Sequence, residues 1–141
     1  MTIPGTLLEI HQYLEEGYKP LIDYGVWRVA ILRYIDELLP ENISKMQRHD
    51  ETDEVFVLLE GHCILFIGEG DEQIAKIHAQ DMEPLILYNM KRSCWHTHTL
   101  SKGTSVLIVE NRDTSSHNSP EIDLTPAQTA SLVEFTQNLW G

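Results

Sequence analysis

Apolar residues in the middle of the chain recur in short runs that favour β-strands. Most runs are rich in aromatic, β-branched and other apolar residues, and KMQRH (45–49) alternates between apolar and polar positions. The runs follow one another at intervals of roughly 8–12 residues, separated by turn residues. They are WRVAILRY (27–34), KMQRH (45–49), EVFVLLEG (54–61), HCILFIGEG (62–70), QIAKIHAQ (73–80), LILYNM (85–90), SCWHTHTL (93–100) and TSVLIVEN (104–111). This pattern predicts an all-β sandwich or closed barrel.

Turn residues organise these runs into one unit. Two runs meet at Glu60 and Gly61, which predicts a tight hairpin turn between neighbouring strands. No internal repeat or linker divides the chain. We therefore expect one domain over residues 1–141, with the barrel core at about 18–112.

Helical periodicity is confined to the two ends of the sequence. The segment TLLEIHQYLEEG has apolar residues at helical spacing, which predicts a short amphipathic helix at 5–16. Near the other end, TPAQ at 125–128 combines an N-cap, a proline at the first helical position and a capping-box glutamine. It predicts a second helix at 126–140.

The charge balance narrows the classes of partner. Ten Lys and Arg residues stand against 22 Asp and Glu residues, a formal net charge of −12. A protein that binds nucleic acid or an anionic membrane needs a basic surface, so we expect neither partner. We expect instead a neutral or cationic small molecule, or a metal cation.

Targeting and redox features favour a cytoplasmic location. The N-terminal residues MTIPGTLLEI lack the cationic start and long apolar core of a signal peptide. No apolar run approaches the length of a membrane span. The two cysteines, Cys63 and Cys94, lie in apolar runs and are predicted to be reduced.

Several chemically active side chains share strand faces with core positions. Because alternate residues of a strand point the same way, Gln47 and His49 share one face, as do His96 and His98. Glu54 likewise aligns with the core face of its strand. An acidic residue in such a position is usually paired or bound to a metal.

Folded into one barrel, these strands bring two or three imidazoles to one carboxylate. His49, Glu54 and His96 would then form a facial triad, which suits iron(II), with manganese, nickel and zinc as further candidates. Gln47 offers either a weak fourth ligand or a hydrogen bond to a metal-bound water. His98 is an alternative ligand, and the sequence leaves this choice open.

The segment QRHDETDEVFVLLEG resembles the first motif of the cupin superfamily, G-x5-H-x-H-x3,4-E-x6-G. His49 matches its second histidine, Glu54 its glutamate and Gly61 its closing glycine. The first histidine is replaced by Gln47 and the leading glycine by Glu41.

The second cupin motif, G-x5-P-x-G-x2-H-x3-N, is matched much less well. His96 fills its histidine position. The other four motif positions are occupied by Leu85, Lys91, Ser93 and Leu100. The resemblance spans roughly residues 40–111 and leaves both terminal segments uncovered.

The resemblance implies a fold and a class of function. The fold is a double-stranded antiparallel β-barrel (cupin or jelly roll) with a divalent transition metal at its mouth. The function is that of an enzyme acting on a small organic molecule, with dioxygenase, isomerase or lyase chemistry. His98 would serve as acid or base if it is not a ligand, and Phe56 and Tyr88 would contact the substrate.

Two further expectations accompany this interpretation. Cupin-like proteins that lack part of the ligand set can act as metal-free, non-catalytic pockets for sugar-like molecules, and Gln47 keeps this alternative open. Small cupins commonly form homodimers through a sheet, which is also the commonest oligomer of proteins in general. The strand at 27–34 is the expected dimer edge.

Overall fold

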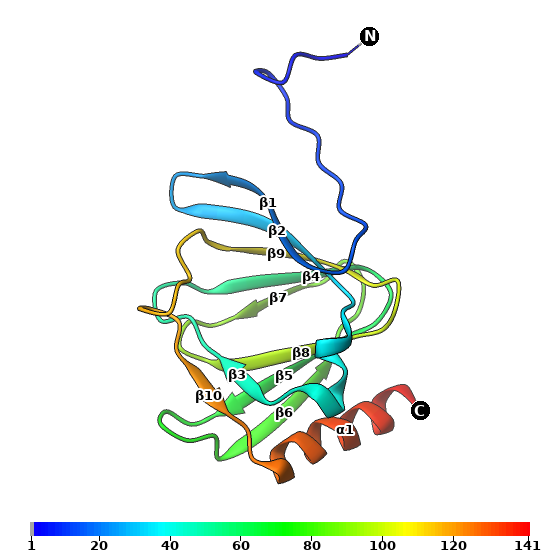
Figure 1. Ribbon diagram of the computed structural model, residues 1–141, viewed down its shortest axis with the longest axis vertical. Helices are drawn as coiled ribbons and strands as arrows, with labels where there is room; N and C mark the ends of the chain where they lie inside the picture. Colours follow the sequence, from blue (N-terminus) through cyan, green and yellow to red (C-terminus); the bar gives the residue numbers. More distant parts are fainter. Residues whose placement is uncertain (1) are drawn as a thin grey trace.

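A computed structural model describes residues 2–141 as two five-stranded antiparallel sheets that face each other, with one α-helix beneath (Figure 1). The first sheet has the order β1 (Gly17–Tyr24), β2 (Trp27–Arg33), β9 (Ser105–Asn111), β4 (Glu54–Glu60) and β7 (Leu87–Met90). The second has the order β10 (Glu121–Asp123), β3 (Lys45–Gln47), β8 (Trp95–Leu100), β5 (Cys63–Glu69) and β6 (Lys76–Asp81). Two short 3-10 helices, Asp36–Leu38 and Pro40–Asn42, connect β2 to β3. The predicted all-β architecture is confirmed.

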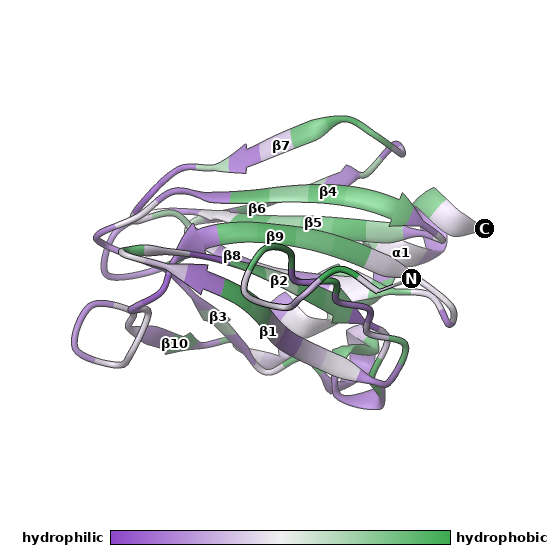
Figure 2. Ribbon diagram, turned by 90° about the horizontal axis from the view of Figure 1, so that it is seen from above, coloured by the Kyte–Doolittle hydropathy of each residue, from purple (hydrophilic) through white to green (hydrophobic). Residues whose placement is uncertain are grey.

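The main core lies between the two sheets and follows from strand alternation. Alternate residues of β2, β4 and β9 point inward, and the central strands are the most apolar part of the molecule (Figure 2). The buried side chains of this core are Ala30, Leu32, Phe56, Leu58, Cys63, Leu65, Met82, Met90, Leu100, Val106 and Ile108. Toward one end of the interior the inward positions are polar or charged, and the candidate site lies there.

Helix α1 (Pro126–Trp140) covers the outer face of the second sheet. Leu132 of α1 is fully buried and packs in one cluster with Ile64 and Phe66 of β5. Because β5 is covered on both faces, its sequence is nearly continuously apolar. The predicted helix at 126–140 is confirmed, and Thr125 and Gln128 form the expected capping box. No helix within residues 2–141 has the length and apolar character that a membrane crossing requires.

The predicted helix at 5–16 is wrong. After one turn near Gly5, the segment runs in an extended form away from the sheets (Figure 1). Its apolar side chains are exposed, with Leu7 at 76% and Ile10 at 84%. An isolated helix this short is only marginally stable in water, and no part of residues 2–141 covers an apolar face here. Helical spacing of apolar residues was therefore not enough to predict a helix here.

The predicted hairpin at Glu60 and Gly61 is also wrong, although the turn is present. β4 pairs with β7 and β9, whereas β5 pairs with β6 and β8 in the opposite sheet. The short connection therefore crosses from one sheet to the other. Turn residues report a reversal of the chain, but they do not specify whether the two strands exchange hydrogen bonds.

The limits of the barrel differ from the prediction in two places. The strand at 27–34 is not an edge, because β2 lies between β1 and β9. A homodimer formed through this sheet would use β1 or β7. The predicted core also stops at 112, whereas β10 pairs with β3 farther along the chain. β10 is three residues long, too short for a period to be recognised after the polar stretch that precedes it.

Gly61 and Gly103 provide a matched test of backbone constraint. Both have positive φ, +87° and +77°. A Cβ at residue 61 would lie 2.7 Å from Cα of Thr104 and still nearer its hydroxyl, whereas a Cβ at residue 103 would meet no atom within 4 Å. We expect Gly103→Ala to lower the free energy of unfolding by about 1–2 kcal/mol, the left-handed penalty alone. Gly61→Ala should cost at least about 2 kcal/mol more.

Guanidinium denaturation of the two variants measures this difference. Equal losses at the two positions would contradict the steric account of Gly61, since both substitutions carry the same left-handed penalty.

Candidate metal centre

The structure brings together the three residues that the sequence indicated as metal ligands. His49 follows β3, Glu54 begins β4 and His96 lies in β8, so both sheets contribute. Oε1 of Glu54 is 3.3 Å from Nε2 of His49 and 2.9 Å from Nε2 of His96. Their ligand atoms all lie within 4.8 Å of one another. All three residues are at most 5% exposed, so little water contacts the Glu54 carboxylate.

Hydrogen bonds made by Nδ1 of His49 and Nδ1 of His96 determine the tautomer of each ring, and so whether the Nε2 atom near Glu54 carries a proton. Nδ1 of His96 lies 2.9 Å from the carbonyl oxygen of Cys94, which can only accept. Nδ1 of His49 lies 2.7 Å from Oγ of Ser119, whose own proton is donated to Asn118. Both Nδ1 atoms are therefore donors, and a neutral ring presents an unprotonated Nε2. Metal-binding histidines are oriented in this way.

With both rings neutral, the cluster around Glu54 carries no positive charge. Burial raises the pKa of Glu54, but donation from His49 and His96, once a proton is on a ring, outweighs burial and holds that pKa well below its ordinary value. Burial lowers the pKa of His96, whereas Glu54 raises it, and the net direction is upward. A proton or a metal ion can therefore occupy the space between these atoms. The donor set fits a divalent transition metal.

A second buried carboxylate, Glu110, was missed by the sequence analysis. It lies in β9 directly opposite Arg28 of β2 and is 5% exposed. Its Oε1 accepts hydrogen bonds from Arg28, at 2.6 and 3.1 Å, and from the hydroxyl of Tyr18, at 3.0 Å. Burial and the charge of Glu54 raise the pKa of Glu110 to about 7. The sequence did contain a signal for Glu110. Like Glu54, it is an acidic residue on the inward face of its strand.

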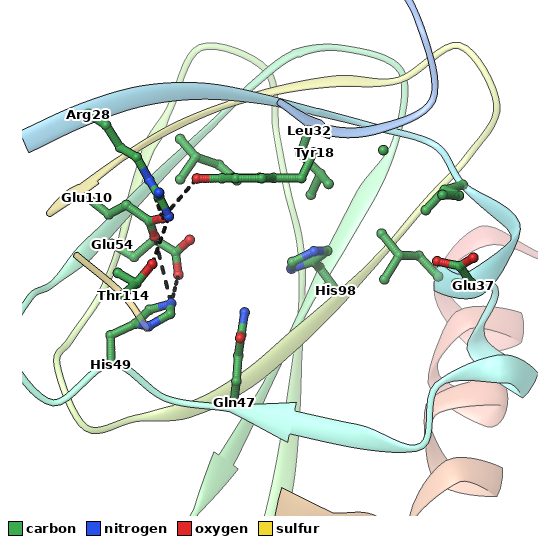
Figure 3. A pocket seen from close by; sticks show the side chains of 14 residues that line it. Tyr18, Arg28, Leu32, Glu37, Gln47, His49, Glu54, His98, Glu110 and Thr114 are labelled. Atoms are coloured by element: carbon green, nitrogen blue, oxygen red, sulfur yellow. Dashed lines mark hydrogen bonds and ion pairs between the residues drawn. The ribbon is translucent and has the colours of Figure 1, made fainter. Parts of the chain in front are cut away.

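A cavity of about 400 Å³ opens beside the cluster. Figure 3 shows Arg28, Glu110, Glu54 and His49 gathered at one end, with Gln47 and His98 farther along. Its other lining residues are Gly17, Tyr18, Leu32, Ile35, Glu37, Leu38, Ile108 and Thr114. The cavity therefore has a charged end and a more apolar end.

Gln47 and His98 line the cavity, but His98 does not join the cluster of potential ligand atoms. Nδ1 of His98 is buried without a hydrogen-bond partner. Burial lowers the pKa of His98 to about 4, so the ring is neutral at physiological pH. Its unpartnered nitrogen is available to a molecule in the cavity.

Phe56 and Tyr88 were predicted to contact the substrate. Among residues 2–141, neither lines the cavity. Phe56 is fully buried in the core, with its ring centroid 6.1 Å from that of His96 and 5.9 Å from that of His98. The hydroxyl of Tyr88 accepts a hydrogen bond from the backbone of Glu83. Phe56 thus packs against the two histidines and limits their movement.

The Arg28–Glu110 pair gives a stability prediction. Arg28→Met leaves Glu110 without its charged partner, and we expect a loss of about 3 kcal/mol in the free energy of unfolding at pH 8. A second change, Glu110→Gln, should restore most of this loss because it removes the uncompensated charge. Arg112→Met is the control, since its side chain and that of Asp23 are more than half exposed and 3.7 Å apart. That variant should lose less than about 1 kcal/mol.

Urea denaturation of the parent protein and these three variants tests the pair. A loss in Arg28→Met no larger than that in Arg112→Met would show that the buried pair contributes no more than a surface pair.

Comparisons with known proteins give structural matches only. No protein-family model and no curated protein matches this sequence. A nucleoside dehydratase, Pac13, matches with 6% identity and a TM-score of 0.53, over 81% of this chain and 85% of its own. A TDP-quinovose 3,4-ketoisomerase from Campylobacter jejuni matches with 15% identity and a TM-score of 0.51, over 65% and 67%.

A cupin-2 domain-containing protein from Shewanella frigidimarina also matches, with 14% identity and a TM-score of 0.48, over 77% of this chain and 88% of its own. At these low identities, the two matches with TM-scores above 0.5 indicate a shared fold alone, whereas reaction and substrate vary among proteins of one fold. Two facing antiparallel sheets, with His49 and Glu54 of the first motif and His96 of the second between them, agree with the resemblance in the sequence. The chain has the cupin fold.

Proposed function

We propose that this protein is a metal-dependent cupin enzyme that acts on a small organic molecule. A divalent transition metal would be held by His49, Glu54 and His96, and the substrate would occupy the adjoining cavity. The observation that carries this proposal is the pair of histidines whose Nδ1 atoms are engaged as donors. Their Nε2 lone pairs face a buried carboxylate oxygen at the cavity wall.

The three ligands suit this role because they leave coordination positions free. Two imidazoles and one carboxylate on one side of an ion are compatible with iron, manganese, nickel or zinc. When bound, such an ion supplies Lewis-acid or dioxygen chemistry. The choice between dioxygenase, isomerase and lyase chemistry rests with the substrate.

The cavity has the volume and lining of a small-molecule site. Its volume lies within the usual range of roughly 300–1,000 Å³. Leu32, Leu38 and Ile108 would exclude water from one side of the substrate. The amide of Gln47 would hydrogen-bond to polar groups, and the free Nδ1 of His98 would accept a hydrogen bond or a proton. We assign His98 as the acid–base group on this ground.

A metal-free binding module is the second candidate. Gln47 replaces the first motif histidine, and a proton on His96 would satisfy Glu54 without an ion because their ligand atoms are only 2.9 Å apart. In this case the same cavity would bind a sugar-like molecule without transforming it. Metal content separates the two functions.

Elemental analysis of tag-free protein, purified without chelators, tests the proposal. We expect about one equivalent of a transition metal in the parent protein and almost none in the His49→Ala/Glu54→Ala variant. The control is His78→Ala/Glu69→Ala, because these residues form a His–Glu pair at 2.6 Å on the exposed surface. The control should keep the parent metal content.

Circular dichroism would establish that all three proteins are folded. Folded parent protein that contains no metal, and that binds none when titrated with Co²⁺, would exclude the metal-dependent enzyme and favour the metal-free module.

A further inference from the structure

Glu110 is a buried carboxylate with one occupied oxygen and one free oxygen. Arg28 and Tyr18 donate to Oε1 from above the cavity (Figure 3). Oε2 is buried and has no hydrogen-bond partner. A buried carboxylate oxygen in this state is costly unless a donor or a cation reaches it. The cupin motif assigns no role to this residue.

His49 of the metal cluster cannot supply the missing donor. Nε2 of His49 lies 3.8 Å from Oε2 of Glu110, beyond hydrogen-bond distance. In the neutral ring this nitrogen carries a lone pair and no proton, because the ring proton is on Nδ1, which donates to Ser119. Glu110 therefore faces another acceptor, as Glu54 does.

Four unpartnered acceptor atoms meet at this end of the cavity. They are Nε2 of His49, Nε2 of His96, Oε1 of Glu54 and Oε2 of Glu110. A single proton can bridge two such atoms, whereas a metal ion bound at Nε2 of His49, which lies 3.8 Å from Oε2 of Glu110, could satisfy more than two of them. The arrangement of Glu110 thus has the same physical explanation as that of the three motif residues.

We infer that Oε2 of Glu110 is a fourth protein ligand of the metal, an inference that rests on the proposed metal site. It supplies the ligand that is lost where Gln47 replaces a histidine, and it leaves Gln47 free to contact the substrate. Arg28 and Tyr18 are positioning residues, because their bonds to Oε1 direct Oε2 toward the cluster.

This ligand set has a chemical consequence. Two carboxylates balance the charge of a divalent ion, and an oxygen donor takes a place that the motif gives to a nitrogen donor. Oxygen-rich sets suit harder ions, so the site should favour manganese or iron(II) over copper.

Titration of the chelator-treated full-length protein with Co²⁺ tests the inference, using calorimetry for affinity and visible absorption for coordination. Glu110→Gln keeps the size of the side chain but replaces the carboxylate. We expect it to bind Co²⁺ at least about tenfold more weakly and to change the ligand-field spectrum. Glu110→Asp, whose shorter side chain withdraws the oxygen, should behave likewise and serves if the glutamine variant does not fold.

Glu69→Gln is the matched control. It makes the same carboxylate-to-amide change at an exposed residue outside the cavity, where Glu69 pairs with His78. We expect a change in Co²⁺ affinity of less than about threefold and a spectrum like that of the parent.

The outcomes separate this inference from the proposed function. Glu110→Gln with parental affinity and spectrum would overturn the fourth ligand. Weaker binding with an unchanged spectrum would also overturn it, because Glu110 would then act through its charge alone. A parent protein that binds no Co²⁺ would instead remove the metal site itself, and the inference with it.

Discussion

The polar end of the interior depends on one constraint, which is that a buried acceptor needs a positive partner. Glu54 and Glu110 are almost fully buried, and the lone pairs of two histidines point toward the same region. Arg28 compensates only one oxygen of Glu110. The remaining acceptors require a proton or a metal ion, because apolar packing cannot replace either. The identity of that cation decides between a catalytic centre and a simple binding pocket.

The two sheets make this cluster possible without disrupting the core. Inward positions of β2, β4 and β9 carry apolar side chains over most of their length, and they carry Arg28, Glu54 and Glu110 at one end. The second sheet supplies His96 from β8 across the interior. Helix α1 covers the opposite face of that sheet, so β8 is held from both sides. The rigid strands therefore fix the ligand atoms, as a preorganised site requires.

The fold of this chain does not determine its reaction, whereas the residues of the site restrict the chemistry. Proteins with this fold and little sequence identity include a nucleoside dehydratase and a ketoisomerase, so the barrel alone does not specify a reaction. The features of this chain that bear on chemistry are local. They are the lone pairs facing Glu54, the free oxygen of Glu110, and the amide of Gln47 and ring of His98 along the cavity. Together they describe a small site lined by several unpartnered acceptors.

The sequence by itself determined the β-rich architecture, the C-terminal helix and the grouping of His49, Glu54 and His96, because strand alternation, capping residues and motif spacing are local patterns. Only the tertiary structure decided which strands pair across Glu60 and Gly61, since a turn does not encode its sheet partners. The segment at 5–16 is extended because no surface within residues 2–141 covers the apolar face that a helix would have, and periodicity does not report this. Glu110 was recognisable on the same grounds as Glu54, but its role depends on Arg28, a partner 82 positions away. Long-range neighbours of this kind are set by the folded chain as a whole.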